Sequence, residues 1–115
     1  MTDLTRRVGR ADLHIHTAAS DGTASVTSVL DRAIELGLDV IAITDHERID
    51  AALAGRALAQ DRGLPLEVVV GEEVTTLGGH LLALGLRRPV RSYRSLRSTI
   101  AEIHDQGALA IPAPV

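Results

Sequence analysis

Short apolar runs alternate along the chain with segments whose apolar residues recur at helical spacing. The apolar runs predict buried strands at residues 11–17, 39–44 and 66–70. Between the first two runs, Ser25 is a suitable helix N-cap, and apolar residues then recur three or four positions apart until Gly37. The same spacing predicts a second helix over about 50–62, which Gly63 ends.

The pattern changes after residue 70. Residues 74–76 and 80–84 flank two consecutive glycines, which predicts a tight hairpin. A further helix is expected over about 93–106, closed by Gly107, and residues 108–112 then begin a fourth core strand. Strands that alternate with helices are typical of right-handed βαβ crossovers and a mostly parallel sheet, which is either doubly wound or part of a barrel.

Composition excludes several classes of protein. The 115 residues suffice for one domain, and twelve arginines against fifteen acidic residues give a net charge of −3, which argues against generic binding of duplex nucleic acid. Cysteine is absent, so thiolate zinc sites and cysteine nucleophiles are excluded. Tyr93 is the only aromatic residue, which argues mildly against base stacking.

The first ten residues contain three arginines and no apolar stretch. We therefore expect residues 1–10 to be an N-terminal extension, neither a secretory signal nor a membrane anchor, and residues 11–115 to form the domain. No apolar run approaches the length of a bilayer span, so a cytoplasmic protein without membrane contact is the default expectation.

The first predicted strand carries Asp12, His14 and His16 at alternate positions. Side chains two positions apart share one face of a strand, so these three groups are expected to project together, and two imidazoles in this arrangement can converge on one metal ion. A chance pair of histidines on a surface or in a core is the competing interpretation.

Polar clusters also follow the second and third predicted strands. Asp45 and His46 end the second strand, where Asp45 either contributes to catalysis as a ligand or an orienting group, or caps the following helix. Nearby Arg48 is a candidate for holding an anion, although the arginines in general are expected on solvated faces. Glu72 and Glu73 end the third strand, and one of them should face the site and the other solvent or a helix.

The shared position of these groups predicts a metal site, because the carboxyl ends of parallel strands are neighbours in space. The candidate ligands lie at strand ends or in adjoining turns: His14, His16, Asp21, His46, Glu73 and His80. Imidazole and carboxylate donors suit manganese, zinc or iron. His104 falls in the last turn of a predicted helix, where a structural role is expected.

Several motifs, in order, resemble the polymerase and histidinol phosphatase (PHP) family of metal-dependent phosphoesterases. They are DLHIHT at 12–17, SDGT at 20–23, GLDVIAITDHE at 37–47, GEEVTT at 71–76 and GHLLALG at 79–85. The resemblance covers about residues 11–113 and implies the N-terminal portion of a distorted (β/α)7 TIM-like barrel, mostly parallel with one hairpin. It also implies two or three divalent metal ions, held by the six candidate ligands, with Glu73 as the bridging carboxylate.

The chain departs from the family pattern at its end. Where the family reads Ala-His-Pro, this chain has Pro114 in place of the histidine, and a later Asp-x-His motif has no counterpart. The resemblance implies hydrolysis of phosphomonoesters, small nucleotides or short oligonucleotides by a metal-activated water. The alternative is a non-catalytic or incomplete PHP module with a structural or interaction role. A barrel ordinarily needs about 200 residues or more, so we expect either a missing C-terminal segment or self-association through an exposed strand edge.

Overall fold

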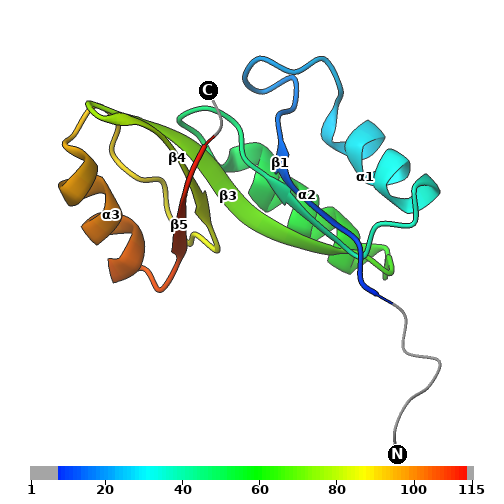
Figure 1. Cartoon of the computed structure of the whole chain (residues 1–115). Helices are drawn as coiled ribbons and strands as arrows, with labels where there is room; N and C mark the ends of the chain where they lie inside the picture. The colour runs from blue at the N-terminus through cyan, green and yellow to red at the C-terminus, as the bar shows by residue number, and fades with distance from the viewer. Residues whose placement is uncertain (1–7, 114–115) are drawn as a thin grey trace, which may run out of the picture.

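The computed structural model describes residues 8–113, which form five strands and three helices (Figure 1). In chain order they are β1 (Ala11–Ile15), α1 (Val26–Glu35), β2 (Val40–Ile43), α2 (Asp50–Asp61), β3 (Glu67–Thr76), β4 (Gly79–Leu84), α3 (Leu96–Asp105) and β5 (Leu109–Pro112). Every strand and helix predicted from the apolar pattern is therefore present, but β3 joins two predicted strands and α3 begins later than predicted.

The five strands form one sheet in the order β1-β2-β3-β4-β5. β1, β2 and β3 pair in parallel, whereas β4 is antiparallel to both β3 and β5. Four strands thus run in one direction and β4 in the other. The sheet curls into half of a barrel, with α1 and α2 outside one half of it and α3 beside β5 (Figure 1). The α/β class and the hairpin are confirmed.

β3 is one continuous strand rather than the two separate strands predicted at 66–70 and 74–76. Its residues 67–70 pair with β2, and its residues 71–76 pair with β4. The strand changes its pairing partner at Gly71. A Cβ atom there would lie 2.8 Å from both the Ala83 carbonyl oxygen and Thr44 Cγ2. Only glycine allows this close approach, so the glycine that interrupts the apolar pattern continues the strand.

The main core lies between the convex face of the sheet and the helices. Ile41 and Ile43 of β2 are fully buried there, and α1 contributes Leu30 and Ala33 from its apolar stripe. Burial of a side chain as large as Leu30 stabilises the fold by about 1.5–3 kcal/mol. Ser25 caps α1 as predicted, since its Oγ accepts a hydrogen bond from Ser28 N–H at 3.2 Å.

The third helix begins later than predicted. Ser95 is its N-cap and accepts a hydrogen bond from Ser98 N–H at 3.1 Å, whereas Tyr93 has a φ of 58° and cannot continue a right-handed helix. The apolar spacing alone did not distinguish this turn from the first turn of a helix.

Part of the concave face of the sheet is open and mostly apolar. A hollow of about 600 Å³ is lined by both edge strands and by β4, with Leu13, Leu82, Leu84 and Ile111 among its lining residues. Among residues 8–113, no helix has the length and apolar character needed to cross a bilayer.

Candidate metal centre

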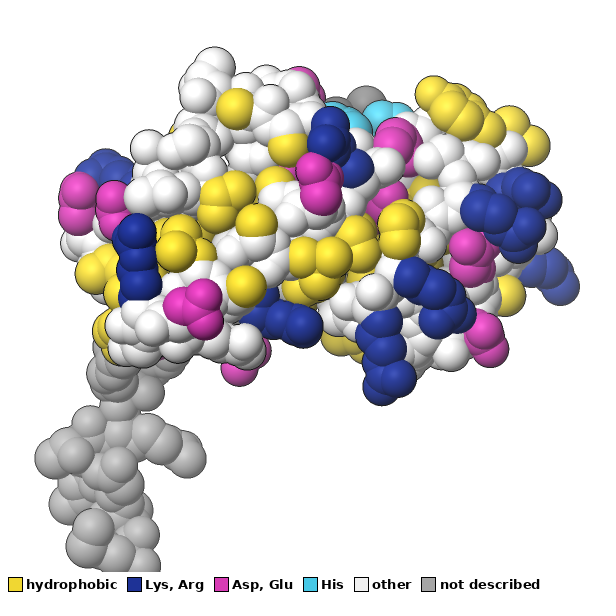
Figure 2. All heavy atoms as spheres, turned by 180° about the vertical axis from the view of Figure 1, so that it is seen from behind, with side chains coloured by type: hydrophobic (Ala, Val, Ile, Leu, Met, Phe, Trp, Pro, Cys, Tyr) yellow, Lys and Arg dark blue, Asp and Glu magenta, His cyan; other side chains and the backbone are white. Residues whose placement is uncertain are grey.

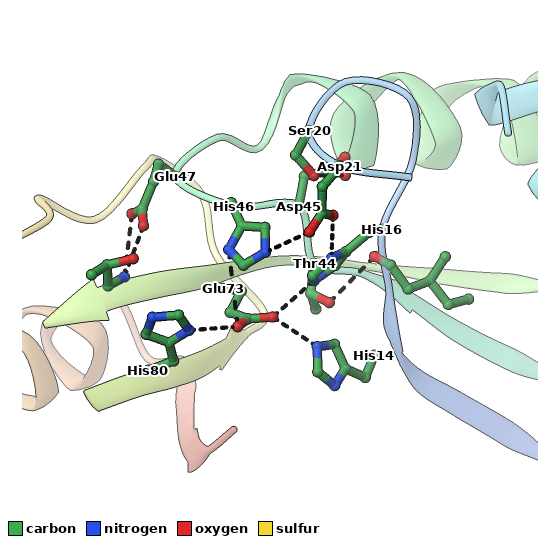
Figure 3. A network of polar contacts seen from close by, with 12 residues as sticks. His14, His16, Ser20, Asp21, Thr44, Asp45, His46, Glu47, Glu73 and His80 are labelled. Carbon is green, nitrogen blue, oxygen red and sulfur yellow. Dashed lines mark hydrogen bonds and ion pairs between the residues drawn. The ribbon is translucent and has the colours of Figure 1, made fainter. Parts of the chain in front are cut away.

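Glu73 lies at the centre of a cluster of imidazoles at the concave face of the sheet (Figure 3). Its Oε1 is 2.8 Å from both His14 Nε2 and His16 Nε2, and its Oε2 is 2.9 Å from His80 Nδ1. Because Glu73 is directly opposite Leu82 and His80 is two residues away, the side chains of Glu73 and His80 share one face of the β3–β4 ladder. A carboxylate of β3 is therefore surrounded by His14 of β1, His16 just after β1 and His80 of β4.

His46 reaches the cluster because the chain after β2 continues beside β3. An isolated parallel bridge pairs His46 with Glu73, supported by hydrogen bonds from Glu73 N–H to Asp45 O at 3.0 Å and from Glu47 N–H to Glu73 O at 3.2 Å. His46 Nδ1 is 3.9 Å from Glu73 Oε2. The ring centroids of His46 and His16 are 4.4 Å apart.

The loop after β1 adds a second carboxylate on the other side of the imidazoles. Asp21 Oδ1 is 2.6 Å from His16 Nδ1, and Asp21 Oδ2 is 3.1 Å from His46 Nε2 (Figure 3). The loop turns tightly at Gly22, whose position leaves no room for a Cβ atom beside the carbonyl oxygen of His16. This turn returns Asp21 to the strand end from which the loop began.

These six residues offer ligand atoms that could hold a metal ion. Three overlapping groups each offer ligand atoms within 4.8 Å of one another: His14, His16 and Glu73; His16, Asp21 and His46; His46, Glu73 and His80. Nitrogen and carboxylate oxygen donors of this kind suit zinc, manganese and iron. His16 has a carboxylate oxygen at each ring nitrogen, an arrangement that requires protons or metal ions between them.

The pKa values of the two carboxylates reflect this concentration of histidines. Burial alone raises the pKa of Glu73, but hydrogen bonds with His14 and His80 and the charge of His46 outweigh it, so that the pKa lies below its ordinary value. Asp21 shows the same balance: desolvation raises its pKa, but the hydrogen bonds and charges of His16 and His46 together outweigh it, so its pKa is also lowered. Both carboxylates are therefore kept in the charged form that a cation requires.

Asp45 lies next to the cluster, but its carboxylate binds the loop after β1 and not the imidazoles. Its buried carboxylate accepts hydrogen bonds from Thr17 N–H at 2.6 Å, Thr17 Oγ1 at 2.7 Å and Ser20 Oγ at 2.6 Å. It does not cap the following helix, whose N-cap is Ile49 without a side-chain hydrogen bond. Asp45 thus ties the end of β2 to the loop that carries Asp21.

Glu47 is a positioning residue that the sequence did not reveal. It has a φ of 58°, and its carboxylate accepts hydrogen bonds from Thr75 N–H at 3.0 Å and from the Ser92 hydroxyl. The turn after His46 is thereby attached to β3 and to the segment before α3. In the sequence, only its position next to His46 indicated a role for Glu47 near the cluster.

Arg48 is held at the rim of the cluster. Its guanidinium makes two contacts of 2.7 Å with Asp50 and donates to Ala19 O at 2.9 Å. It lines, together with His46, an open pocket of about 650 Å³.

Glu72 points to the opposite face of the sheet from Glu73. Only Glu73 of the pair lies in the cluster, as predicted; Glu72 does not lie in solvent and is close enough to Glu102 of α3 to feel its charge. It is fully buried, and its Oε1 accepts a hydrogen bond from Val90 N–H at 2.8 Å. Desolvation by burial raises its pKa to about 7.

All six predicted ligands therefore lie in one cluster, and their role as ligands stays a prediction. Asp12 does not join them, because its carboxylate accepts a hydrogen bond from the His14 backbone N–H, and the pairing register of β1 with β2 shifts between Asp12 and Ile15. His104 lies in the last turn of α3, as expected, outside this cluster. Pro114 lies outside the described residues.

Comparison with known proteins agrees with this geometry. The family model described as the PHP domain matches residues 12–106. Among curated proteins, the chain is 34% identical to the uncharacterized protein MJ1587 of Methanocaldococcus jannaschii over 113 residues, 89% of this chain and 65% of the relative. It is 39% identical to the 5'-3' exoribonuclease Rnm of Salmonella typhimurium over 66 residues, 57% of this chain and 22% of that protein.

A solved structure has a similar fold. The crystal structure of a two-domain protein from Bacteroides vulgatus, containing a predicted PHP-like metal-dependent phosphoesterase, matches with a TM-score of 0.75 and 26% identity. The match covers 88% of this chain and 33% of that chain. The chain thus spans under two thirds of the length of each of these relatives.

Proposed function

This chain belongs to the PHP domain family of metal-dependent phosphoesterases, and from that premise we propose that its histidine and carboxylate cluster binds divalent metal ions and supports phosphoester hydrolysis. The observation that carries the proposal is the overlap of three ligand groups through His16, His46 and Glu73. A shared ligand allows neighbouring cations to act on one phosphate.

The residues have distinct roles in this proposal. Glu73 is the shared carboxylate between two ligand groups, and Asp21 supplies the second anionic ligand from a loop. Asp45 is a positioning residue, because its hydrogen bonds hold the loop that carries Asp21. Arg48 at the pocket rim offers its positive charge to a substrate anion while Asp50 fixes its orientation.

Divalent cations in such a site neutralise phosphoryl oxygens and lower the pKa of a water molecule. The protein's own contribution is a set of donors held by strands and therefore organised before a substrate arrives. Substrates are proposed to be phosphorylated small molecules or short nucleotides. The relatives include a 3',5'-nucleoside bisphosphate phosphatase of Chromobacterium violaceum, 35% identical over 65% of this chain.

Metal binding is tested first by thermal unfolding with and without manganese. The wild type should gain melting temperature on addition of the ion, because a ligand that binds only the folded state stabilises it. Glu73→Gln should lose most of this gain. Glu72→Gln is the matched control, since the neighbouring carboxyl group points to the other face and should keep the gain.

Hydrolysis is tested with p-nitrophenyl phosphate and manganese. We expect metal-dependent turnover that His46→Ala abolishes and that His104→Ala retains, because His104 is exposed on α3 outside the cluster. Turnover that is independent of metal, or unchanged in His46→Ala, would remove the catalytic interpretation.

A non-catalytic metal-binding module is the second candidate. The resemblance implies a histidine where this chain has Pro114, which offers no ligand atom, and this departure favours the second candidate. This candidate predicts the manganese-induced gain in melting temperature without turnover of p-nitrophenyl phosphate.

A further inference from the structure

Five of the twelve arginines fall within one short segment, residues 87–97. No acidic residue occurs between positions 85 and 101, so this part of the chain is strongly basic although the whole chain has a net charge of −3. Figure 2 shows arginine side chains gathered over the end of the molecule that carries α3. The positive charge is therefore concentrated on one region of the surface.

Most of these arginines have no acidic partner within residues 8–113. Arg91 contacts Glu102 at 3.3 Å, and Arg88 lies 3.7 Å from Asp105. The other three, Arg87, Arg94 and Arg97, take part in no ion pair in the described part of the chain, and their side chains are exposed. Their guanidinium groups are available to an anionic partner.

The only aromatic side chain of the chain lies in the middle of this basic segment. Tyr93 is 68% exposed and has a φ of 58°, a conformation that a tyrosine rarely adopts. Two leucines nearby, Leu77 at the hairpin turn and Leu96 at the start of α3, are 75% and 40% exposed. A single aromatic residue argues against stacking of many bases, but an exposed ring beside apolar side chains, with arginines that lack acidic partners, has the chemistry of a surface on which one nucleobase stacks.

The segment is adjacent to the candidate metal centre at two points. Tyr93 N–H donates to Thr75 O at 2.8 Å, and Thr75 is paired directly with His80. Earlier in the segment, Arg87 and Arg88 line the same pocket of about 650 Å³ as His46. A chain bound along the segment would therefore lie next to the cluster.

We propose that residues 87–97 form a binding surface for single-stranded nucleic acid, with arginines contacting phosphates and Tyr93 stacking on a base. The orientation of this strand, with a terminal phosphate toward the metal centre, rests on the proposed function. Duplex nucleic acid is a poorer fit, because its bases are already stacked on one another and cannot pack on Tyr93. The bound class is a short single strand.

The test measures binding of a fluorescein-labelled, 5'-phosphorylated single-stranded RNA by fluorescence anisotropy, in EDTA so that no hydrolysis occurs. A DNA strand of the same sequence distinguishes recognition of the 2'-hydroxyl from recognition shared by both sugars. Arg94→Ala/Arg97→Ala should weaken binding about tenfold and reduce the slope of log affinity against log salt by about 1.4, since each lost phosphate contact removes about 0.7.

The matched control is Arg32→Ala/Arg62→Ala, which removes the same charge from α1 and from the C-cap of α2. It should retain the affinity and the salt dependence of the wild type. Tyr93→Leu should weaken binding about tenfold, and Tyr93→Phe should keep it, because the ring and not the hydroxyl stacks. Circular dichroism melting verifies that each variant is folded.

Three results would overturn the proposal: unchanged affinity in Arg94→Ala/Arg97→Ala, unchanged affinity in Tyr93→Leu, or an equal loss in the control pair. Binding of a duplex of the same sequence as tightly as the single strand would also overturn it. The outcome is separable from that of the proposed function. If the wild type hydrolyses p-nitrophenyl phosphate but does not bind the RNA, the proposed binding surface alone is refuted. If it binds the RNA but does not hydrolyse p-nitrophenyl phosphate, the proposed hydrolysis alone is refuted.

Discussion

Glu72 should make the stability of this protein depend on pH in a defined window. Its carboxyl group is fully buried, one oxygen accepts only the Val90 N–H, and the other has no hydrogen-bond partner in the described part of the chain. Desolvation by burial, assisted by the nearby charges of Glu47 and Glu102, raises its pKa from an ordinary 4.5 to about 7. The buried acid is therefore largely protonated where an exposed one would be charged.

Proton linkage determines the sign of the effect. Between pH 4.5 and pH 7 the unfolded chain releases the Glu72 proton while the folded chain retains it, so the free energy of unfolding falls as the pH rises and levels off above this window. From about pH 5 to pH 8 the expected loss is about 2–3 kcal/mol, because each tenfold change in proton affinity is worth about 1.4 kcal/mol.

The perturbation is Glu72→Gln, which keeps the shape of the side chain and the acceptor for Val90 N–H but does not titrate. Urea unfolding of both proteins at pH 5 and at pH 8, in EDTA, gives the change in unfolding free energy for each. The variant should lose about 2–3 kcal/mol less than the wild type over this range. The fixed cost of burying the amide cancels, because it is present at both pH values.

Every other ionisable group is present in both proteins and cancels from the comparison in the same way. Parallel pH dependences for the wild type and Glu72→Gln would refute the reasoning, since they would mean that the buried carboxyl group ionises as readily as it does in the unfolded chain.

Three further predictions concern the elements that position the site. Gly71→Ala should destabilise the fold by about 1–3 kcal/mol in urea unfolding, because the added Cβ meets backbone where β3 changes partners. Asp45→Asn should cost about 1–3 kcal/mol, since an amide nitrogen would face hydrogen-bond donors of Thr17, and faster hydrogen exchange at the Thr17 amide should report it. Gly22→Ala should move the loop away from the His16 carbonyl and reduce the manganese-induced gain in melting temperature; an unchanged gain would contradict this role.

Local features of the sequence predicted most of the elements and all six members of the cluster. The ends of α1 follow from Ser25 and Gly37, because an N-cap hydroxyl and a residue with positive φ act within a single turn. Alternation along the predicted strand indicated that His14 and His16 project together, and both contact Glu73 although β1 ends at Ile15. These predictions succeed since their physical causes lie within a few residues of one another.

Other features were decided only by the packing of distant segments. The apolar pattern alone could not show which of Glu72 and Glu73 faces the site, because that choice depends on the register between β3 and β4; the family motif indicated Glu73. It could not show that Asp45 holds the loop of residues 17–20, because its partners lie 25 to 28 positions away. The curl of the sheet and the continuity of β3 through Gly71 likewise depend on the approach of Thr44 and Ala83.

The sequence by itself therefore determined the chemical groups of this protein and the short elements that carry them. The tertiary structure decided which groups meet, which of two adjacent carboxyl groups is buried in the core, and how one basic segment lies against the cluster. The physical reason is that helix caps, turns and strand alternation act over a few bonds, whereas register, burial and long-range hydrogen bonds exist only once distant segments pack together.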